Sequence, residues 1–462
     1  ASEAGRRKSE RNKKRPVWHK DYQMDSTALL TNGIEDVPES YNSIEGRRDA
    51  ADWYAAVRDE LNSLTENQTW DVVDLPRGAK VITSKWVFKK KVDKNGDLER
   101  LKARLVARGF QQTASVDYHD TFAPVAKLST VRFLLAVGIQ RSFEFWHMDV
   151  TTAFLYGELD ETIFMKPPPG LDVEAGKVCE LKRSLYGLKQ SPKCWNNRLH
   201  SFLSSLNFER SDADYCLYVR IAHTERLYIL LYVDDLLICG NNSSEIAVLK
   251  QQLSAEFRMK DLGQLEYFMG MRIRIDDAAG TVTIDQTVFA ERILERFGME
   301  ACNAVATPLE LGVKFDSAES SDEVRTNFRQ LIGSLMYLML GTRPDLCFAI
   351  NLFSRYQDKA TCEHWNCVKR VLRYIKGTTG MHLMYTRKDE ATPLVGYVDS
   401  DWANDPDDRR STSGYLFEVY GNLISWTTKK QGLVTLSTAE AEYVAASQAV
   451  CEAIWFKKLF QD

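Results

Sequence analysis

Two kinds of hydrophobic pattern alternate along the chain. Apolar residues that recur every three or four positions are typical of a helix with one buried face, whereas alternating or continuous apolar runs favour a buried strand. In the first part of the chain these patterns predict helices over residues 49–64, 130–141, 191–206 and 244–258. They predict strands over residues 143–150, 215–219 and 227–239.

A β-hairpin is predicted over residues 80–110. Residues 85–89 form its first β-prone run and residues 101–106 its second, and the segment 93–97 between them contains Asn-Gly. Asn-Gly favours a tight turn because both residues tolerate a left-handed backbone.

A second unit is predicted to begin near residue 326. Its pattern indicates helices over residues 328–340, 347–356 and 363–376, strands over 394–399, 413–419 and 423–428, and a final helix over 438–460. Residues 1–45 are polar and lack an apolar period, which predicts a flexible tail. A chain of 462 residues with this order of elements predicts an α+β protein of two to four domains.

Composition favours a folded protein that does not cross a membrane. Hydrophobic residues make up 44% and aromatic residues 11% of the chain, which argues against extensive disorder. The most apolar run, residues 227–239, is interrupted by Asp234 and Asp235, so it does not predict a membrane span. The start is basic, without Met or an apolar segment, so we expect no secretory signal and excision from a longer precursor.

The nine cysteines include no CxxC pair, which fits a reducing compartment. Cys362, His364 and Cys367 come nearest to a metal cluster, but their spacing matches no zinc module. Because they lie in a predicted helix, we interpret them as ordinary helix positions, with a metal site as the alternative.

Charge is unevenly distributed. The net charge of −4 argues weakly against a nucleic-acid partner. Residues 1–20 nevertheless hold eight Lys or Arg against two acids, and residues 80–108 hold ten against three. Local basic stripes of this kind suit phosphate binding, although a charge run is usually just a solvated face.

Two adjacent carboxylates, Asp234 and Asp235, lie inside the apolar run 227–239. Buried carboxylates repel each other and cost several kcal/mol each unless cations compensate them. An Asp-Asp turn is the alternative, but such a turn would be exposed and flanked by polar residues. A third carboxylate, Asp149, ends another apolar strand and would by itself be interpreted as a turn residue or helix N-cap. Together the three could hold two Mg²⁺ ions about 4 Å apart.

Tyr232-Val233-Asp234-Asp235 resembles the catalytic box of reverse transcriptases, and nearly the whole chain resembles the copia group of LTR retrotransposons. The stretches that match the group, in its order, are 67–70, 85–88, 102–110, 121–125, 148–150, 153–155, 185–192 and 260–263. Such a series of motifs in one order is far more specific than any one tetrapeptide.

The resemblance implies a right-hand polymerase with fingers, palm and thumb, followed by a connection region and an incomplete RNase H-like domain. It also implies an RNA-directed and DNA-directed DNA polymerase that binds two Mg²⁺ ions, with Mn²⁺ as an alternative. The catalytic residues are then Asp149, Asp234 and Asp235, and Val150 joins them at the metal site. A catalytically silent nucleic-acid-binding remnant is the alternative function.

The resemblance also implies a nucleotide site. Its dNTP-binding residues are Lys102, Arg104, Phe154, Tyr186, Lys189 and Lys260. Phe154 would select against a ribose 2′-OH, or else is an ordinary core residue. Lys102 and Arg104 would meet the triphosphate, with Lys85 and Lys89 as alternatives. Tyr186 stands where retroviral enzymes usually carry Gln and would stack on template or nucleotide, and Lys260 would protonate pyrophosphate. Met269 and Gly270 would grip the primer, unless they form only a buried strand and turn.

In the last segment, Asp399 and Glu442 match RNase H metal ligands by resemblance, whereas Glu440 is interpreted as a helix-start charge. The family's domain continues beyond these positions, so we expect no RNase H activity from this chain and poor packing of its last ~70 residues.

The implied domains are a basic linker after integrase (1–45), fingers, palm and thumb (46–310), connection helices (311–390) and part of an RNase H-like domain (391–462). The implied partners are an RNA template, an RNA or DNA primer, dNTPs, and the integrase and capsid regions of a parent polyprotein, without a membrane. The implied location is a cytoplasmic virus-like particle, with later nuclear entry of the product.

Overall fold

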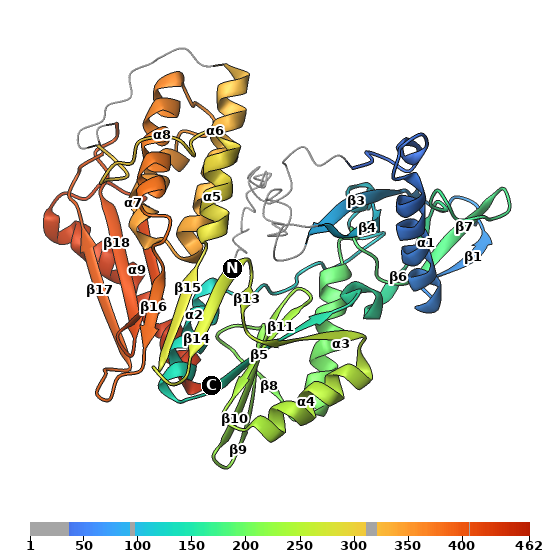
Figure 1. Cartoon of the computed structure of the whole chain (residues 1–462), viewed down its shortest axis with the longest axis horizontal. Coiled ribbons are helices and arrows are strands. Elements are labelled where there is room, and N and C mark those ends of the chain that lie inside the picture. Colours follow the sequence, from blue (N-terminus) through green and yellow to red (C-terminus); the bar gives the residue numbers. More distant parts are fainter. Residues whose placement is uncertain (1–36, 93–97, 311–320, 406) are drawn as a thin grey trace, which may run out of the picture. The chain divides into compact units, whose positions relative to one another are not determined.

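The structure is a computed structural model that describes residues 37–92, 98–310, 321–405 and 407–462 (Figure 1). The predicted flexible tail up to residue 36 and the Asn-Gly turn of segment 93–97 lie outside the described residues. The helices and strands predicted from the hydrophobic pattern are present within these ranges, with shifts of a few residues at their ends.

The first elements of the described chain pack around helix α1. One face of α1 is apolar and packs on the hairpin of β3 and β4, where Trp53 meets Phe88 edge-on at 5.3 Å between ring centroids. A four-stranded sheet of order β1-β7-β6-β2 completes this region. The bounds are α1 (Ala50–Glu66), β1 (Trp70–Asp74), β2 (Val81–Ile82), β3 (Ser84–Val92), β4 (Leu98–Ala107), β6 (Glu158–Met165) and β7 (Lys177–Arg183).

A six-stranded antiparallel sheet of order β12-β5-β11-β10-β9-β8 forms the centre. Leu227–Leu231 and Leu236–Cys239 are buried at every position, because both faces of these strands are covered. That coverage explains why the sequence there is continuously apolar rather than alternating. The bounds are β5 (Glu144–Val150), β8 (Glu209–Arg210), β9 (Leu217–Ala222), β10 (Glu225–Tyr232), β11 (Asp235–Gly240), β12 (Met259–Gln264), α2 (Leu128–Gln140), α3 (Ser191–Ser205) and α4 (Ser243–Glu256).

A third sheet has the order β13-β14-β15-β16, and within the described residues helices α5 to α8 are inserted between its paired strands β15 and β16. Figure 1 shows α5, α6, α7 and α8 grouped beyond one end of β14 and β15. Helix α5 contacts α6 and α8, although the predicted thumb and connection would divide these helices at residues 310 and 311. The bounds are β13 (Tyr267–Phe268), β14 (Met271–Asp276), β15 (Thr281–Asp285), α5 (Thr287–Arg296), α6 (Asp322–Gly341), α7 (Cys347–Ser354), α8 (Cys362–Gly377) and β16 (Leu383–Thr386).

The last segment forms a three-stranded antiparallel sheet and a long helix. These are β17 (Leu394–Ser400), β18 (Thr412–Val419), β19 (Asn422–Lys430) and α9 (Thr438–Gln461). The expected poor packing is wrong for one face of this segment. Phe417, Ile424 and Phe456 are buried in the same core as the central sheet, because Phe133 of α2 packs against Phe456 and Phe460. The edge strand β17 keeps most of its residues exposed. Large apolar side chains also stay exposed on the loop before α9 and on α9 itself, at Leu433, Val434, Leu436, Tyr443, Val450 and Ile454.

A buried arginine of α2 links the last segment to the central part of the structure. Arg132 of α2 donates to the carbonyls of Ile424 and Leu340 at 2.7 Å each, and its guanidinium lies 4.1 Å from the Trp426 ring centroid. Burial lowers the pKa of Arg132 to about 10, which leaves the side chain charged at neutral pH.

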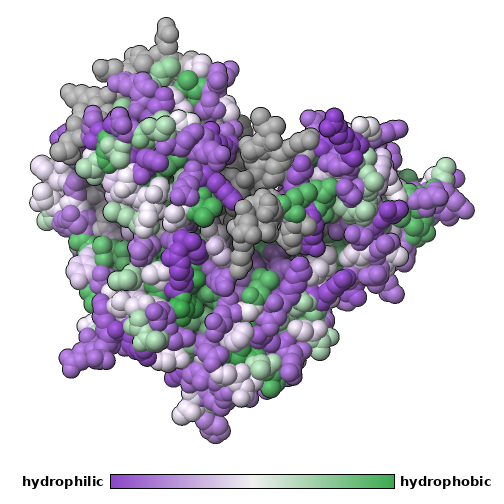
Figure 2. Space-filling model, viewed as in Figure 1, coloured by the Kyte–Doolittle hydropathy of each residue, from purple (hydrophilic) through white to green (hydrophobic). Residues whose placement is uncertain are grey.

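On the face shown in Figure 2 most residues are hydrophilic, and the apolar residues there lie in small groups. No helix within the described ranges combines the length and apolarity needed to cross a membrane.

Candidate active site

Strand pairing brings two of the three predicted carboxylates face to face. Asp235, the first residue of β11, pairs with Asp149 near the end of β5. Directly opposed residues of antiparallel strands place their side chains on the same face of the sheet, with Cβ atoms about 5 Å apart. The third carboxylate, Asp234, lies in the turn that joins β10 to β11, where Tyr232 pairs with Asp235. The predicted hairpin is therefore present, and it delivers all three carboxylates to one end of the central sheet.

Hydrogen bonds from two neighbouring elements fix the turn that contains Asp234. Val233 has a φ of +58°, a left-handed conformation that is costly for a β-branched residue. Its carbonyl accepts a hydrogen bond from the buried Trp195 indole N–H at 2.6 Å. The carbonyl of Asp234 accepts from the Val150 N–H at 2.8 Å. Helix α3 and strand β5 thus fix the backbone on which the carboxylates stand.

The three carboxylates lie close enough to repel one another. Burial, and after it the negative charges of Asp235 and Asp149, raise the pKa of Asp234 to about 6, against a lowering by Arg104. This repulsion is what a bound cation would relieve, so the donor set suits Mg²⁺. Among the described residues, however, no three His, Cys, Asp or Glu side chains converge into a ready-made metal cage.

One neighbour of these carboxylates, His147, was not predicted from the sequence. Its Nε2 lies 2.9 Å from Oδ1 of Asp235, and its ring meets Phe268 edge-on at 5.6 Å. His147 precedes Asp149 by two residues on β5, so both side chains share one face of the strand. That alternation was a signal available in the sequence. Its partner could not be inferred without the register that makes Asp235 a diagonal neighbour.

Lys260 lies on the other side of Asp149. Strand β12 pairs with β5 so that Lys260 stands directly opposite Asp149, and Lys260 is exposed. Asp149, Asp235 and Lys260 therefore occupy adjacent positions on one face of three neighbouring strands.

The side chains of one arginine and two aromatic residues pack against one another beside the carboxylates. The guanidinium of Arg104 on β4 lies 4.2 Å from the centroid of the Tyr186 ring. Tyr186 meets Phe154 edge-on, with 4.5 Å between ring centroids. Because Arg104 also lowers the pKa of Asp234, the whole group lies near the carboxylate turn. Phe154, in the short 3-10 helix Ala153–Tyr156, is only 8% exposed and packs into the core.

The other lysines predicted for phosphate binding lie on the β3–β4 hairpin, except Lys189. Lys102 precedes Arg104 by two residues on β4 and shares its face, and Lys89 of β3 pairs directly with Lys102. Lys85 pairs with Val106 and is exposed. Lys189 is also exposed, and its N–H donates to the Gln112 side chain at 2.8 Å.

The loop with Tyr186 rests directly on the end of β4. The Ala107 N–H donates to the Tyr186 carbonyl at 2.7 Å. Gly187 has a φ of +94°, and a Cβ on it would lie 2.1 Å from the Ala107 carbonyl oxygen. A Cβ on Gly109 would likewise lie 2.1 Å from the Gly187 carbonyl oxygen. This backbone approach requires glycine at both positions and sets where Tyr186 stands relative to Arg104.

The predicted primer-gripping residues form the turn between β13 and β14. Phe268 pairs with Met271, and the two central residues Met269 and Gly270 have φ values of +50° and +74°. Phe268 also lies 6.5 Å from the Tyr232 ring, so this turn adjoins the carboxylate hairpin.

The two residues that match RNase H ligands lie on elements in contact. Asp399 is on β17 and Glu442 is in the first turns of α9, which packs on β17, and both side chains are exposed. The interpretation of Glu440 is confirmed, because its side chain accepts from the Leu436 N–H at 2.7 Å at the start of α9.

The histidine of the possible metal cluster has a capping role. His364 takes part in a capping box with Thr361 at the start of α8, which supports ordinary helix positions for its group. Within the described part of the chain that group forms no metal site.

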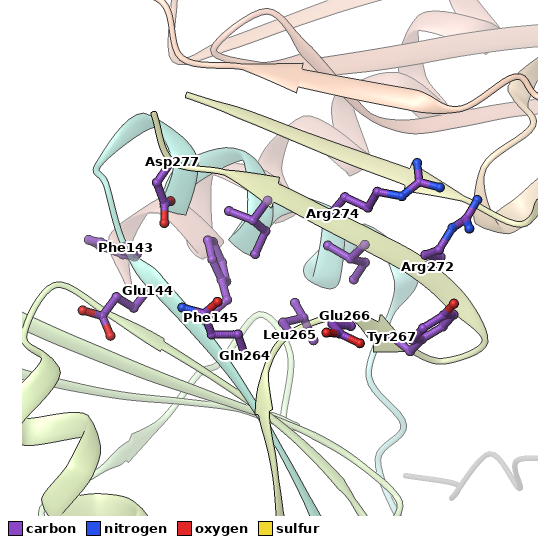
Figure 3. Close-up of a pocket in the computed structure, with 12 residues that line it drawn as sticks. Phe143, Glu144, Phe145, Gln264, Leu265, Glu266, Tyr267, Arg272, Arg274 and Asp277 are labelled. Atoms are coloured by element: carbon purple, nitrogen blue, oxygen red, sulfur yellow. The ribbon is translucent and has the colours of Figure 1, made fainter. Parts of the chain in front are cut away.

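A pocket of about 380 Å³ lies at the opposite end of β5 from Asp149. Figure 3 shows that Phe143, Phe145, Leu265 and the arginines Arg272 and Arg274 are among its lining residues. The carboxylate site is therefore separate from this pocket.

Comparison with known proteins identifies the family. Residues 67–311 match the family model described as reverse transcriptase (RNA-dependent DNA polymerase). The chain is 39% identical to the retrovirus-related Pol polyprotein from transposon TNT 1-94 of Nicotiana tabacum, over 99% of this chain and 35% of that protein. It is 36% identical to the corresponding polyprotein from transposon RE2 of Arabidopsis thaliana, over 95% of this chain and 30% of that one.

The chain thus spans about a third of the length of these curated relatives. A solved structure of a foamy viral protease-reverse transcriptase in complex with double-stranded DNA has a TM-score of 0.46 and 13% identity, covering 87% of this chain and 60% of that one. That likeness is too weak to support an argument. The family matches confirm the resemblance drawn from the motifs: the chain belongs to the reverse transcriptase family, among the Pol polyproteins of copia-type retrotransposons.

Proposed function

We propose that this chain is an RNA-directed and DNA-directed DNA polymerase that extends a primer 3′ end by two-metal nucleotidyl transfer. The observation that carries the proposal is the meeting of Asp149, Asp235 and Asp234 at one end of the central sheet, with a raised pKa at Asp234. Repelling carboxylates on a rigid backbone are a donor set that divalent cations stabilise.

The chemistry of the bound ions would be activation of the primer 3′-hydroxyl and stabilisation of the leaving pyrophosphate. The chain's own residues hold and orient the reactants. Asp149, Asp234 and Asp235 would hold the ions, with Val150 beside them. His147 would keep one oxygen of Asp235 oriented through its 2.9 Å contact.

The nucleotide would lie between the hairpin of β3 and β4 and the carboxylates. Arg104 and Lys102, on one face of β4, would bind its phosphates, because a guanidinium fork matches phosphate oxygens. Lys260, opposite Asp149, would give a proton to the leaving pyrophosphate. The turn of Met269 and Gly270 would support the primer end, and Tyr186 and Lys189 would face the nascent base pair.

In this proposal the regions of the chain correspond to fingers, palm and thumb, followed by an RNase H-like segment. The relatives named above are Pol polyproteins, which supports a parent polyprotein with integrase and capsid regions. Action in a cytoplasmic particle, followed by nuclear entry of the DNA product, completes the proposal.

Primer extension tests the proposed function. The chain should add dNTPs to a DNA primer on an RNA template and on a DNA template when Mg²⁺ is present, and EDTA should abolish the addition. Binding of primer–template without extension on either template would contradict the polymerase and favour a catalytically silent binding remnant.

Magnesium should stabilise the protein in a pH-dependent way. The pKa of Asp234 is raised to about 6, so the carboxylate binds metal well above that pH and loses affinity as the pH falls through it. In metal-free protein the pH dependence of stability has the opposite sign. The raised pKa of Asp234 contributes stability that is fully present below about pH 4 and is lost as the pH rises through about 6. Thermal unfolding should therefore shift upwards with Mg²⁺ much more at about pH 8 than at about pH 5. In Asp234→Asn both effects should shrink, and equal Mg²⁺ shifts in the two proteins would contradict the assignment.

Phe154→Val should admit ribonucleotides. If the Phe154 ring lies under the sugar, its removal should raise the ratio of rNTP to dNTP incorporation by about 10-fold or more. Phe145→Val is the matched control, because Phe145 is a buried core residue toward the other end of β5. An unchanged ratio in Phe154→Val, with a loss of stability like that of the control, would identify Phe154 as an ordinary core residue.

A further inference from the structure

The turn between β13 and β14 has a strained tip. Both of its central residues, Met269 and Gly270, have left-handed backbone, as a tight two-residue hairpin turn requires. Glycine adopts this conformation freely, whereas methionine does not. Something outside the turn must therefore favour the conformation of Met269.

A side chain from a distant helix meets this tip. The Tyr337 hydroxyl of α6 donates a hydrogen bond to the Met269 carbonyl. A Cβ on Gly270 would lie 2.3 Å from the same hydroxyl, so the absence of a side chain at Gly270 makes room for Tyr337. The Tyr337 ring is itself packed edge-on against Phe289 of α5, with 4.9 Å between centroids.

The Tyr337 hydroxyl stays a donor at neutral pH. Burial raises the pKa of Tyr337 to about 12, so the proton that it gives to the Met269 carbonyl is retained. The hydrogen bond connects residues 68 positions apart and links helix α6 to the turn between β13 and β14.

The same turn is in contact with the carboxylate site. Phe268, the residue before Met269, lies edge-on to His147 and to Tyr232. His147 in turn contacts Asp235. Phe268 thus links the turn to the neighbourhood of the carboxylates through its contacts with two rings.

We infer that Tyr337 is a positioning residue that fixes the Met269–Gly270 turn and, through it, the primer 3′ end relative to Asp235. The inference rests on the proposed polymerase function. Helix α6 then contributes to the alignment of the primer, although α6 begins more than fifty residues after the turn ends.

Tyr337→Phe tests the inference, because it removes the hydroxyl and keeps the ring against Phe289. Tyr385→Phe is the matched control: the Tyr385 hydroxyl is also buried and also donates to a backbone carbonyl, that of Leu423, at 2.7 Å. Each variant loses a partly buried hydrogen bond from a tyrosine hydroxyl to a backbone carbonyl, but only the first touches the turn. Thermal unfolding should report that both variants are folded.

The expected result is a rise of about 10-fold in the KM for primer–template, or in its dissociation rate, in Tyr337→Phe alone. Amide hydrogen exchange at residues 268–271 should also accelerate in that variant and not in Tyr385→Phe. Equal primer–template KM and dissociation rate in the two variants would overturn the inference.

Hydrogen exchange separates this inference from the proposed function. If wild-type protein extended no primer, the polymerase proposal would fail for its own reason, and the positioning of the primer end would fail with it. Unchanged exchange at residues 268–271 in Tyr337→Phe, with primer extension intact in wild type, would overturn the inference alone.

Discussion

Replacement of Asp235 or Asp149 by Asn should reduce single-nucleotide incorporation by at least about a thousandfold and leave the fold intact. The two residues are directly opposed on β11 and β5, so each change removes one of the charges that would hold a cation. Asn keeps the shape of the side chain, and removal of one negative charge lessens the repulsion on Asp234. The variants should therefore unfold at the same temperature as metal-free wild type or above it.

The control for these variants is Asp261→Asn. Asp261 lies on β12 of the same sheet, beside Lys260, and its carboxylate pairs with Lys250 at 2.6 Å. The change in net charge is identical, but the side chain is paired away from the proposed ions. Incorporation within a few-fold of wild type is expected for Asp261→Asn. Incorporation by Asp235→Asn at the wild-type level would remove that residue from the catalytic set.

Gly187→Ala should disable incorporation through the backbone rather than through any lost side chain. The added Cβ would lie 2.1 Å from the Ala107 carbonyl oxygen, and the φ of +94° is itself unfavourable for alanine. The loop must therefore move away from β4, which carries Tyr186 away from the Arg104 guanidinium. We expect incorporation to fall by about 100-fold or more, because misplacement by about 1 Å is this costly in an oriented site.

Alanine substitutions at two other glycines separate the two effects of Gly187→Ala, the unfavourable φ and the close approach to another backbone carbonyl. Gly176 has a similar φ of +91° but open space around it, so Gly176→Ala isolates the backbone effect, about 1–2 kcal/mol of stability with incorporation preserved. Gly109→Ala isolates the close approach, because it meets the Gly187 carbonyl without the positive φ. Measured by primer extension and thermal unfolding, Gly109→Ala should resemble Gly187→Ala. If Gly176→Ala were as inactive as Gly187→Ala, the close approach would not be the cause.

The carboxylate hairpin could be predicted from the sequence because its signals are local. Asp234 and Asp235 stand inside one apolar run, and the run itself indicates a buried hairpin. The family motifs then placed Asp149 with them. What the sequence did not contain was the register that opposes Asp149 to Asp235 and makes His147 a diagonal neighbour of Asp235.

The contacts that the sequence analysis missed join residues far apart in the chain. Tyr337 meets Met269 and Gly187 meets Ala107 only after helices and loops have docked, and periodicity carries no information about docking. The packing of Phe456 and Phe460 on α2 was missed for the same reason: the expectation considered only the sheet of the last segment and not the central core that covers it.

Single-turnover incorporation of one dNTP on an RNA template, by wild type beside Asp234→Asn, tests the central claim most directly. Primer–template binding should be measured on the same samples, so that chemistry and binding are separated. The account predicts Mg²⁺-dependent extension by wild type, none detectable by Asp234→Asn, and similar binding by both. Binding by wild type without extension, or equal extension by the two proteins, would contradict the assignment of these carboxylates to a polymerase site.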